Sequence, residues 1–241
     1  MPTASERLRG TISLVRGPLT ALIRKTWLHP RLGELYPEFL FAMYGVTADS
    51  APAMQRAAEI SARLADKDPL ANFLRDYFLE HAEEERGHER WIETDLAQFG
   101  ITRTALEQRL PYPSVAALVG AQRFWMEQVH PVAYLGYLAV LEAPATNEFL
   151  KEVSARTGIP LASMSAHVLH ATLDPGHVAE FDRTLDELSL TGQQQDLITI
   201  SAITTVTHLE RVFTDILEHF ERIEHPARAQ TIFSASRAVL A

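Results

Sequence analysis

The stretch PLANFLRDYFLEHAEEERGHERWIETDLAQF, residues 69–99, indicates the fold class most directly. Pro69 suits the first turn of a helix, and a glycine at position 100 is typical of a helix C-terminus. Between these two signals no apolar–polar alternation of the kind that predicts a strand is present. We therefore expect one long helix over residues 69–99.

The rest of the chain consists of further helical segments separated by proline and glycine. Pro18 is expected to kink a helix over 4–26, Pro144 to bend another, and the DPG sequence at 174–176 to begin a new one. No fixed-period repeat, low-complexity tract or long linker divides the chain, so we expect a single all-α domain over 1–241. The other expected helices cover residues 33–45, 49–65, 102–110, 114–129, 131–142, 161–173, 174–188 and 194–223.

Composition excludes several classes of protein. The chain of 241 residues has 22 Lys and Arg against 31 Asp and Glu, a formal net charge of −9, and no basic run. It is therefore not expected to bind nucleic acid or an anionic membrane. The absence of cysteine excludes disulfides, thiolate zinc sites, iron–sulfur clusters and thiol nucleophiles. Without a signal peptide or an apolar run of about 18 residues, the expected location is the cytoplasm.

The sequence EHAEEERGH, residues 80–88, concentrates metal-binding residue types. On a helix with about 100° per residue, His81 lies about 20° from His88, and Glu84 and Glu85 lie about 40° and 60° away on opposite sides. His81, His88 and either Glu84 or Glu85 would then share one stripe. A row of glutamates is more often a solvated face, which at least one of the three residues 83–85 must be.

A second segment, HVLHATLDPGH at residues 167–177, contains the spacing His-x3-Asp-x2-His at His170, Asp174 and His177. The first segment repeats this spacing with glutamate in place of aspartate. Two segments that each direct imidazole and carboxylate groups at a common point can enclose a metal ion. His167 by itself is interpreted as an ordinary core or surface histidine.

A third segment, LGYLAVLE at residues 135–142, ends an apolar helix with a single carboxylate, Glu142. A buried, unpaired carboxylate costs several kcal/mol, so Glu142 needs a cation, a proton or an arginine partner. Imidazole and carboxylate ligands without thiolate suit iron, manganese or zinc. Carboxylate-rich sites of this kind in helical bundles leave coordination positions open for dioxygen and substrate. The three segments together favour metal binding over three separate coincidences.

These motifs resemble those of the heme-oxygenase-like diiron oxidases and oxygenases, which include the CADD-like iron-containing redox enzymes. The resemblance covers most of the chain. It rests on the motif of 170–177, the glutamate that closes 136–142, the run that ends at His88 and the GIP break at 158–160. The interval from His88 to Glu142 also suits the family. The resemblance implies a single-domain heme-oxygenase-like helical bundle of about seven core helices, without haem.

The resemblance further implies two irons held by three histidines and three carboxylates. The residues that match family ligands by position are His88, Glu142, His170, Asp174 and His177.

The remaining carboxylate departs from the family pattern. Many relatives have a glutamate seven residues before the matching histidine, where this chain has His81. Either His81 replaces that glutamate, or Glu84 or Glu85 supplies the carboxylate from the same face. The spacing favours Glu85, with His81 as an additional ligand or as a partner of the ligands.

The activity implied by the resemblance is that of a non-haem diiron oxidase or oxygenase. Two Fe(II) ions per chain would use dioxygen as cosubstrate against a small organic molecule, an amino acid, an amine or a fatty acid, in specialised metabolism. An external electron donor is a further expected partner, and a homodimer is the expected assembly. The residues expected to line the substrate pocket are Tyr36, Phe39, Phe41, Tyr44, Phe124, Tyr134 and Tyr137.

Three other interpretations stay open. A ferritin-like diiron protein would use Glu85-x-x-His88, although a second Glu-x-x-His is missing from the sequence. A metal-free binding or interaction protein of the thiaminase-like branch of the same fold would not require the motif of 170–177. A true heme oxygenase would need a proximal ligand such as His29, which lies at a helix break.

Overall fold

The chain is α-helical throughout the part that the structure describes. The computed structural model describes residues 2–142 and 146–224, without the side chains of 173–175, 223 and 224. Eleven α-helices, a π-helical segment and two 3-10 turns lie in these ranges, and none of them contains a strand, which confirms the all-α prediction. No helix within them is both long enough and apolar enough to cross a bilayer. The helices are α1 (Ala4–Val15), α2 (Gly17–Trp27), α3 (Leu32–Arg63), α4 (Ala71–Glu84), α5 (Glu89–Gln98), α6 (Arg103–Gln108), α7 (Pro113–Phe124), α8 (Tyr134–Leu141), α9 (Asn147–Thr157), α10 (Ser165–Glu187) and α11 (Gly192–Glu224).

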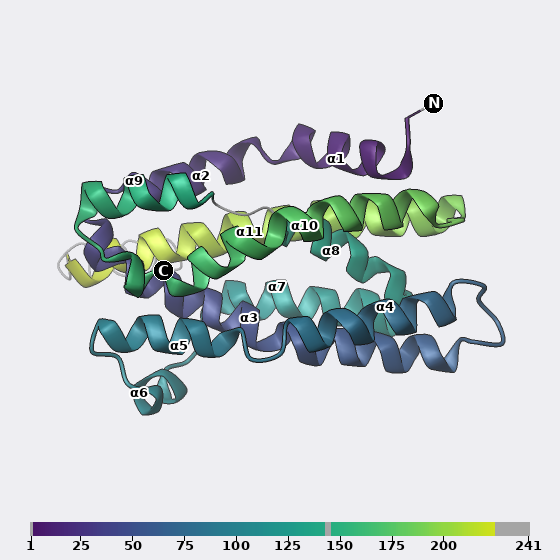
Figure 1. Ribbon diagram of the computed structural model, residues 1–241, viewed down its shortest axis with the longest axis horizontal. Helices are drawn as coiled ribbons and strands as arrows, with labels where there is room; N and C mark the ends of the chain where they lie inside the picture. The colour runs from purple at the N-terminus through teal and green to yellow at the C-terminus, as the bar shows by residue number, and fades with distance from the viewer. Residues whose placement is uncertain (1, 143–145, 225–241) are drawn as a thin grey trace, which may run out of the picture.

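Helix α11 is the central element of the bundle. It packs against α1, α2, α3, α7 and α8, while α4 and α5 pack against α3 on the opposite side of the molecule from α1 and α2 (Figure 1). Its buried side chains recur every three or four residues, as expected of a helix that buries one broad stripe. Each large apolar side chain in such a stripe contributes about 1.5–3 kcal/mol when fully buried. They include Ile198, Ala202, Val206, Leu209, Phe213, Ile216 and Phe220.

Helix α8, which leads to Glu142, packs directly on the backbone of α11 at Gly136. A Cβ atom on Gly136 would lie 2.1 Å from the carbonyl oxygen of Ile198 and 2.8 Å from the amide nitrogen of Ala202. Both atoms belong to the backbone of a helix that is packed on several sides, so they cannot move aside easily. Glycine at this position therefore sets how closely Glu142 and its helix approach the centre of the bundle.

Outside the α4–α5 region, three predicted helix boundaries are wrong. The helix expected over 4–26 is two helices, α1 and α2, separated at Arg16. The boundaries expected after Gly45 and at 174–176 do not exist, because α3 continues through Pro37 and Pro52 and α10 continues through 174–176. A proline within a helix costs about 3 kcal/mol, but α3 buries apolar side chains before and after both of its prolines. Packing therefore outweighs the local signal.

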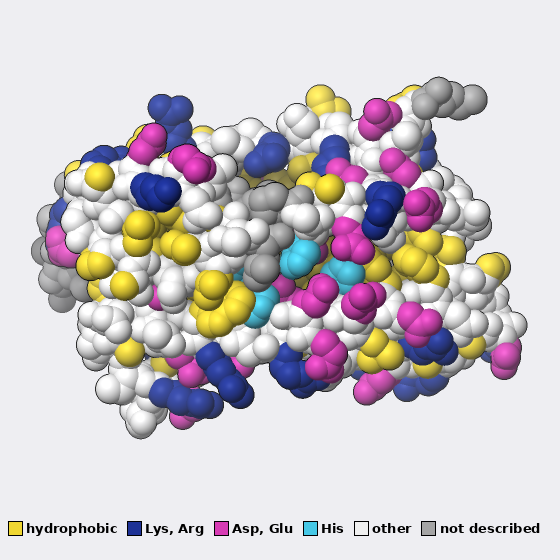
Figure 2. All heavy atoms as spheres, in the orientation of Figure 1, with side chains coloured by type: hydrophobic (Ala, Val, Ile, Leu, Met, Phe, Trp, Pro, Cys, Tyr) yellow, Lys and Arg dark blue, Asp and Glu magenta, His cyan; other side chains and the backbone are white. Residues whose placement is uncertain are grey.

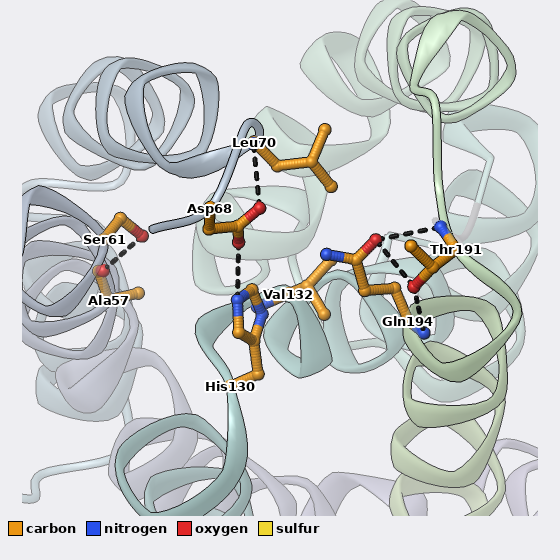
Figure 3. Close-up of polar contacts among 8 residues, drawn as sticks. All are labelled: Ala57, Ser61, Asp68, Leu70, His130, Val132, Thr191 and Gln194. Carbon is orange, nitrogen blue, oxygen red and sulfur yellow. Dashed lines mark hydrogen bonds and ion pairs between the residues drawn. The ribbon is translucent and has the colours of Figure 1, made fainter. Parts of the chain in front are cut away.

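Hydrogen bonds of half-buried polar groups stabilise the turn between α3 and α4. Figure 3 shows Asp68, in the turn between α3 and α4, accepting from Leu70 N at 2.9 Å and contacting His130 Nε2 at 2.7 Å. The other ring nitrogen of His130, Nδ1, accepts from Val132 N at 3.1 Å. The break expected at His130-Pro131 is therefore a 3-10 turn, and the contact of His130 with Asp68 connects it to the turn between α3 and α4. Helix α8 follows this 3-10 turn directly.

Gly136→Ala is expected to destabilise the fold by about 2–3 kcal/mol, because the added methyl group overlaps the backbone of α11. The free energy of unfolding from urea denaturation measures this effect. Gly120→Ala is the matched control: Gly120 lies in α7 with no atom within 4 Å of an added Cβ. That substitution should stabilise the protein by about 0.5–1 kcal/mol, the ordinary gain in a helix interior. Equal effects of the two substitutions would contradict the close α8–α11 contact.

Candidate metal centre

The chain turns sharply between α4 and α5, so the continuous helix predicted over 69–99 is wrong. Gly87 has φ +90°, a conformation that glycine adopts readily and other residues rarely do. The last residue of α4 is Glu84 and the first of α5 is Glu89, which leaves Glu85 and His88 in the turn. The stripe expected to join His81 to His88 therefore does not form, although the turn itself keeps Glu85 beside His88.

Three of the predicted ligands converge at this turn. One ligand atom from each of Glu85, His88 and His170 lies within 4.8 Å of the others. Glu85 Oε2 is 3.3 Å from His88 Nδ1, and the imidazole rings of His88 and His170 have centroids 5.0 Å apart. His88 is buried, with 6% of its surface exposed, and Glu85 and His170 are half-buried. The arrangement places one carboxylate and two imidazoles around a common point.

The electrostatics of the cluster favour the ionised carboxylate. Burial raises the pKa of Glu85, but the adjacent imidazole of His88 and the charges of His170 and His177 lower it, so the net pKa lies below its ordinary value. Glu85 is therefore a carboxylate at neutral pH. A carboxylate binds metal in this form, and it needs no proton to be lost before it does so.

The cluster is held together by a carboxylate that sequence reasoning missed. Asp95 of α5 is fully buried and accepts hydrogen bonds from Ser165 N at 2.9 Å, Ser165 Oγ at 2.6 Å and Ala166 N at 3.0 Å. These donors form the N-terminus of α10, which favours negative charge. Asp95 thereby fixes α10, and His170 on it, to the helix that begins directly after His88. Seventy residues separate Asp95 from Ser165, so no local pattern predicts the contact.

Tryptophan packing fixes the orientation of the two imidazoles. The ring of Trp91 stacks on His88 with centroids 3.8 Å apart and an interplanar angle of 25°. The same indole meets His170 edge-on at 5.6 Å. Trp91 follows His88 by three residues, a spacing that places both on one face of a helix. The three-residue spacing is the feature of the sequence from which the contact of Trp91 with His88 could have been predicted.

Four of the other five predicted ligands line one cavity of about 850 Å³. Glu142 follows the last residue of α8, and His177 is half-buried on α10; both line this cavity together with Glu85 and His170. Asp174 is in α10, four residues after His170, but its side chain lies outside the described residues.

His81 and Glu84 also line the cavity but are not part of the three-residue cluster. His81 Nδ1 donates to Tyr77 O at 2.9 Å, because a carbonyl oxygen only accepts, so Nε2 is the nitrogen that carries a lone pair. A histidine ligand often donates its other ring nitrogen to a backbone carbonyl in this way. Glu84 is exposed. Figure 2 shows histidine side chains gathered in the middle of one face of the molecule, with acidic side chains next to them.

The remainder of the cavity wall is mainly apolar. Of the seven aromatic residues expected there, Phe39 and Tyr137 line it; the other five do not, and Phe124 is 55% exposed. Aromatic residues are buried in any part of a core, so their aromatic character by itself did not predict which of them line the cavity. Aromatic residues that sequence reasoning did not place in the wall are Trp27, Phe149 and Phe213, and His167 lines it as well.

The donor set fits a metal ion. His88 Nδ1 is buried, and its 3.3 Å contact with Glu85 Oε2 does not have the geometry of a hydrogen bond. An unsatisfied buried nitrogen costs about 1–3 kcal/mol, which a cation between His88, Glu85 and His170 would offset. Two imidazole nitrogens and a carboxylate oxygen, with no thiolate, suit iron, manganese or zinc.

Comparison with known families agrees with this donor set. The sequence profile of a family described as "Iron-containing redox enzyme" matches residues 38–206, more than half of the chain. The chain belongs to this iron-containing redox enzyme family. The matched range includes all eight predicted metal-binding residues. No curated protein matches its sequence significantly.

Solved structures establish the heme-oxygenase-like fold of the chain. A domain of unknown function from Shewanella denitrificans, described as having that fold, is 20% identical, with a TM-score of 0.76 over 90% of this chain and 92% of that one. A TenA homologue from Pseudomonas syringae is 15% identical, with a TM-score of 0.66 over 90% and 93%. A TenA homologue from P. horikoshii is 14% identical, with a TM-score of 0.56 over 89% and 98%. At these identities the likeness concerns the fold alone.

Asp95→Ala is expected to destabilise the protein by about 2–3 kcal/mol, because the N–H groups of Ser165 and Ala166 lose their buried acceptor. Because α10 would then be held less firmly, the affinity for ferrous iron should fall as well. Chemical denaturation and iron titration measure the two effects. Asp76→Ala is the control: Asp76 is exposed and, among the described residues, pairs only with its neighbour Arg75, so its loss should cost less than about 0.5 kcal/mol. Unchanged stability and iron affinity in Asp95→Ala would show that Asp95 does not position α10.

Proposed function

We propose that this protein is a non-haem diiron oxidoreductase that uses dioxygen to oxidise a small organic substrate. The observation that supports this proposal best is the convergence of Glu85, His88 and His170 next to a large cavity. The candidate substrates are those expected from the sequence: an amino acid, an amine or a fatty acid. Membership of an iron-containing family supports the choice of metal.

The residues divide into two groups that could each hold one ion. Glu85, His88 and His170 form the group whose ligand atoms are already close together. Glu142 and His177, which line the same cavity, would hold the second ion together with Asp174. When bound, the irons would supply the dioxygen chemistry, which no amino-acid side chain can perform by itself.

The chain itself contributes the surroundings of the reaction. Apolar side chains from α2, α3 and α11 line the cavity and keep water away from a bound substrate. Glu85 contributes a fixed negative charge that offsets the charge of a ferrous ion. An oxidation that does not take all its electrons from the substrate needs an external donor, so an electron-transfer partner is part of this proposal.

The alternatives have less support. The likeness to TenA homologues concerns the fold at 14–15% identity, and a metal-free binding protein would have no use for the cluster of Glu85, His88 and His170. The ferritin-like interpretation conflicts with the heme-oxygenase-like fold. A haem-binding role for His29 has no basis in the cavity, because His29 does not line it and its Nδ1 accepts from Arg31 N.

Purified protein loaded anaerobically with ferrous iron is expected to hold about two irons per chain. Glu85→Gln should remove at least half of this iron, because an amide is a far weaker ligand than a carboxylate. Glu83→Gln is the matched control, since Glu83 is exposed and pairs with Arg86; it should keep the full iron content. Metal analysis of the desalted proteins gives the answer. A wild-type protein that retains no iron would refute the diiron proposal in favour of the metal-free alternative.

The role of His81 can be separated from that of His88. His88→Ala should lose most of the bound iron, because His88 belongs to the three-residue cluster. His81→Ala should keep at least half of it, because His81 lies outside that cluster. The same metal analysis applies to both variants. If His81→Ala lost more iron than His88→Ala, His81 rather than Glu85 would take the place of the glutamate ligand that many relatives have seven residues before the matching histidine.

Use of dioxygen is tested by mixing the ferrous protein with dioxygen in a stopped-flow spectrophotometer, across a panel of amino acids, amines and fatty acids. A substrate that produces a transient visible absorption band and speeds the oxidation of the iron would identify the class. Oxygen consumption that no compound of the panel changes would count against all three candidate classes.

A further inference from the structure

One part of the cavity wall is a cluster of aromatic rings around His167. Its centroid lies 5.3 Å from the ring of Trp27 and 5.4 Å from that of Phe39. Phe149 and Phe213 extend the same wall, at 5.5 Å from Trp27 and 5.7 Å from Phe39 respectively. His167 is the titratable side chain within this otherwise apolar section, and the proposed metal ligands do not include it.

A hydrogen bond determines which nitrogen of His167 carries the proton. Tyr36, which is fully buried, has its hydroxyl oxygen 2.9 Å from His167 Nδ1, and the hydroxyl has no other hydrogen-bond partner among the described residues. A buried O–H that is not donated costs about 1–3 kcal/mol. The hydroxyl therefore donates to Nδ1, which leaves the proton of the neutral imidazole on Nε2.

The imidazole stays neutral under ordinary conditions. Burial, together with the nearby charge of His170, lowers the pKa of His167 to about 4. At neutral pH the ring thus presents one N–H donor, at Nε2, and no positive charge. Nε2 has no hydrogen-bond partner in the described part of the chain. It is not completely buried, and His167 lines the cavity.

We propose that the Nε2–H group of His167, oriented by Tyr36, is the substrate-recognition donor of the aromatic section of the cavity wall and selects molecules with an apolar body and an oxygen acceptor at one end. The proposal rests on the proposed function, because it takes this cavity to be the substrate site. It narrows the substrate class to carbonyl, carboxyl or hydroxyl compounds. Beside His167, alkylammonium ions are disfavoured, since their N–H groups would face another N–H donor and would find no acceptor there.

The physical basis is the cost of an unmatched buried group. An apolar pocket gains most of its affinity from burial, and a few fixed polar groups then decide between substrates. A ligand that satisfies a buried donor is favoured over one that leaves it unpaired by far more than a methylene group contributes. Tyr36 matters because, without its hydroxyl, either nitrogen of His167 could carry the proton.

The test measures binding of octanamide, octanol, octanoic acid and octylamine to the full chain by isothermal titration calorimetry. Measurements are made first without metal and again after anaerobic loading with ferrous iron. The three oxygen compounds are expected to bind the wild-type protein roughly tenfold or more tightly than octylamine. Octanamide and octanol are the decisive probes in the loaded protein, because octanoate could also bind iron through its carboxylate.

Two substitutions test the donor and its orientation separately. His167→Phe removes the donor and keeps an aromatic ring, so the preference for oxygen compounds should disappear. Tyr36→Phe leaves the ring in place and frees its tautomer, so the affinity for octylamine should rise relative to that for octanamide. His208→Phe is the matched control, since His208 lies on α11 and does not line the cavity; it should keep the wild-type preference.

The outcomes are separable from those of the proposed function. The proposal is overturned if the wild-type protein binds none of the four probes, if it binds octylamine as tightly as octanamide, or if the preference survives in both His167→Phe and Tyr36→Phe. Should His167→Phe fail to fold, Tyr36→Phe decides by itself. Failure to bind iron would refute the diiron proposal. A preference for the oxygen compounds over octylamine in the metal-free protein would still support the role of His167 as donor.

Discussion

The buried carboxylate of Asp95 is the contact on which the arrangement of the metal centre depends. It lies on α5 and accepts three hydrogen bonds from the first residues of α10, so it joins the helix that begins after His88 to the helix that carries His170. Burial raises the pKa of Asp95 above its ordinary value, and the hydrogen bonds from the N-terminus of α10 offset part of this cost. Two segments far apart in the sequence are thereby held at a fixed distance, which a metal site requires.

The metal centre combines groups that are costly to bury. Glu85 is ionised and half-buried, and His88 Nδ1 has no hydrogen-bond partner in the described structure. Trp91 stacks on His88 and holds its ring in one orientation. A cation between Glu85, His88 and His170 would offset these costs together, and membership of an iron-containing redox enzyme family supports the proposal that this cation is iron. Stability and function would then depend on the same interaction.

The cavity has walls of two kinds, and each suits a different task. Carboxylates and imidazoles from the α4–α5 turn, from the end of α8 and from α10 lie on one side, where they could hold metal. Aromatic rings from α2, α3, α9 and α11 surround His167 elsewhere in the wall. Helix α10 contributes to both, because His167 and His170 are three residues apart on one face. A substrate held at the aromatic wall would therefore lie beside the metal-binding wall.

The sequence by itself determined the helical class, the donor types and the two groups of histidine and acidic residues, because helical periodicity and the spacing of ligands are local properties. It also indicated Glu85 rather than His81 as the carboxylate position, and the structure places Glu85 in the cluster. Only the tertiary structure decided that the chain turns at Gly87 and that α10 continues through 174–176. The contacts of Asp95 with Ser165 and of Tyr36 with His167 join residues 70 and 131 positions apart. Such contacts exist only once packing has selected one arrangement among the many that local preferences allow.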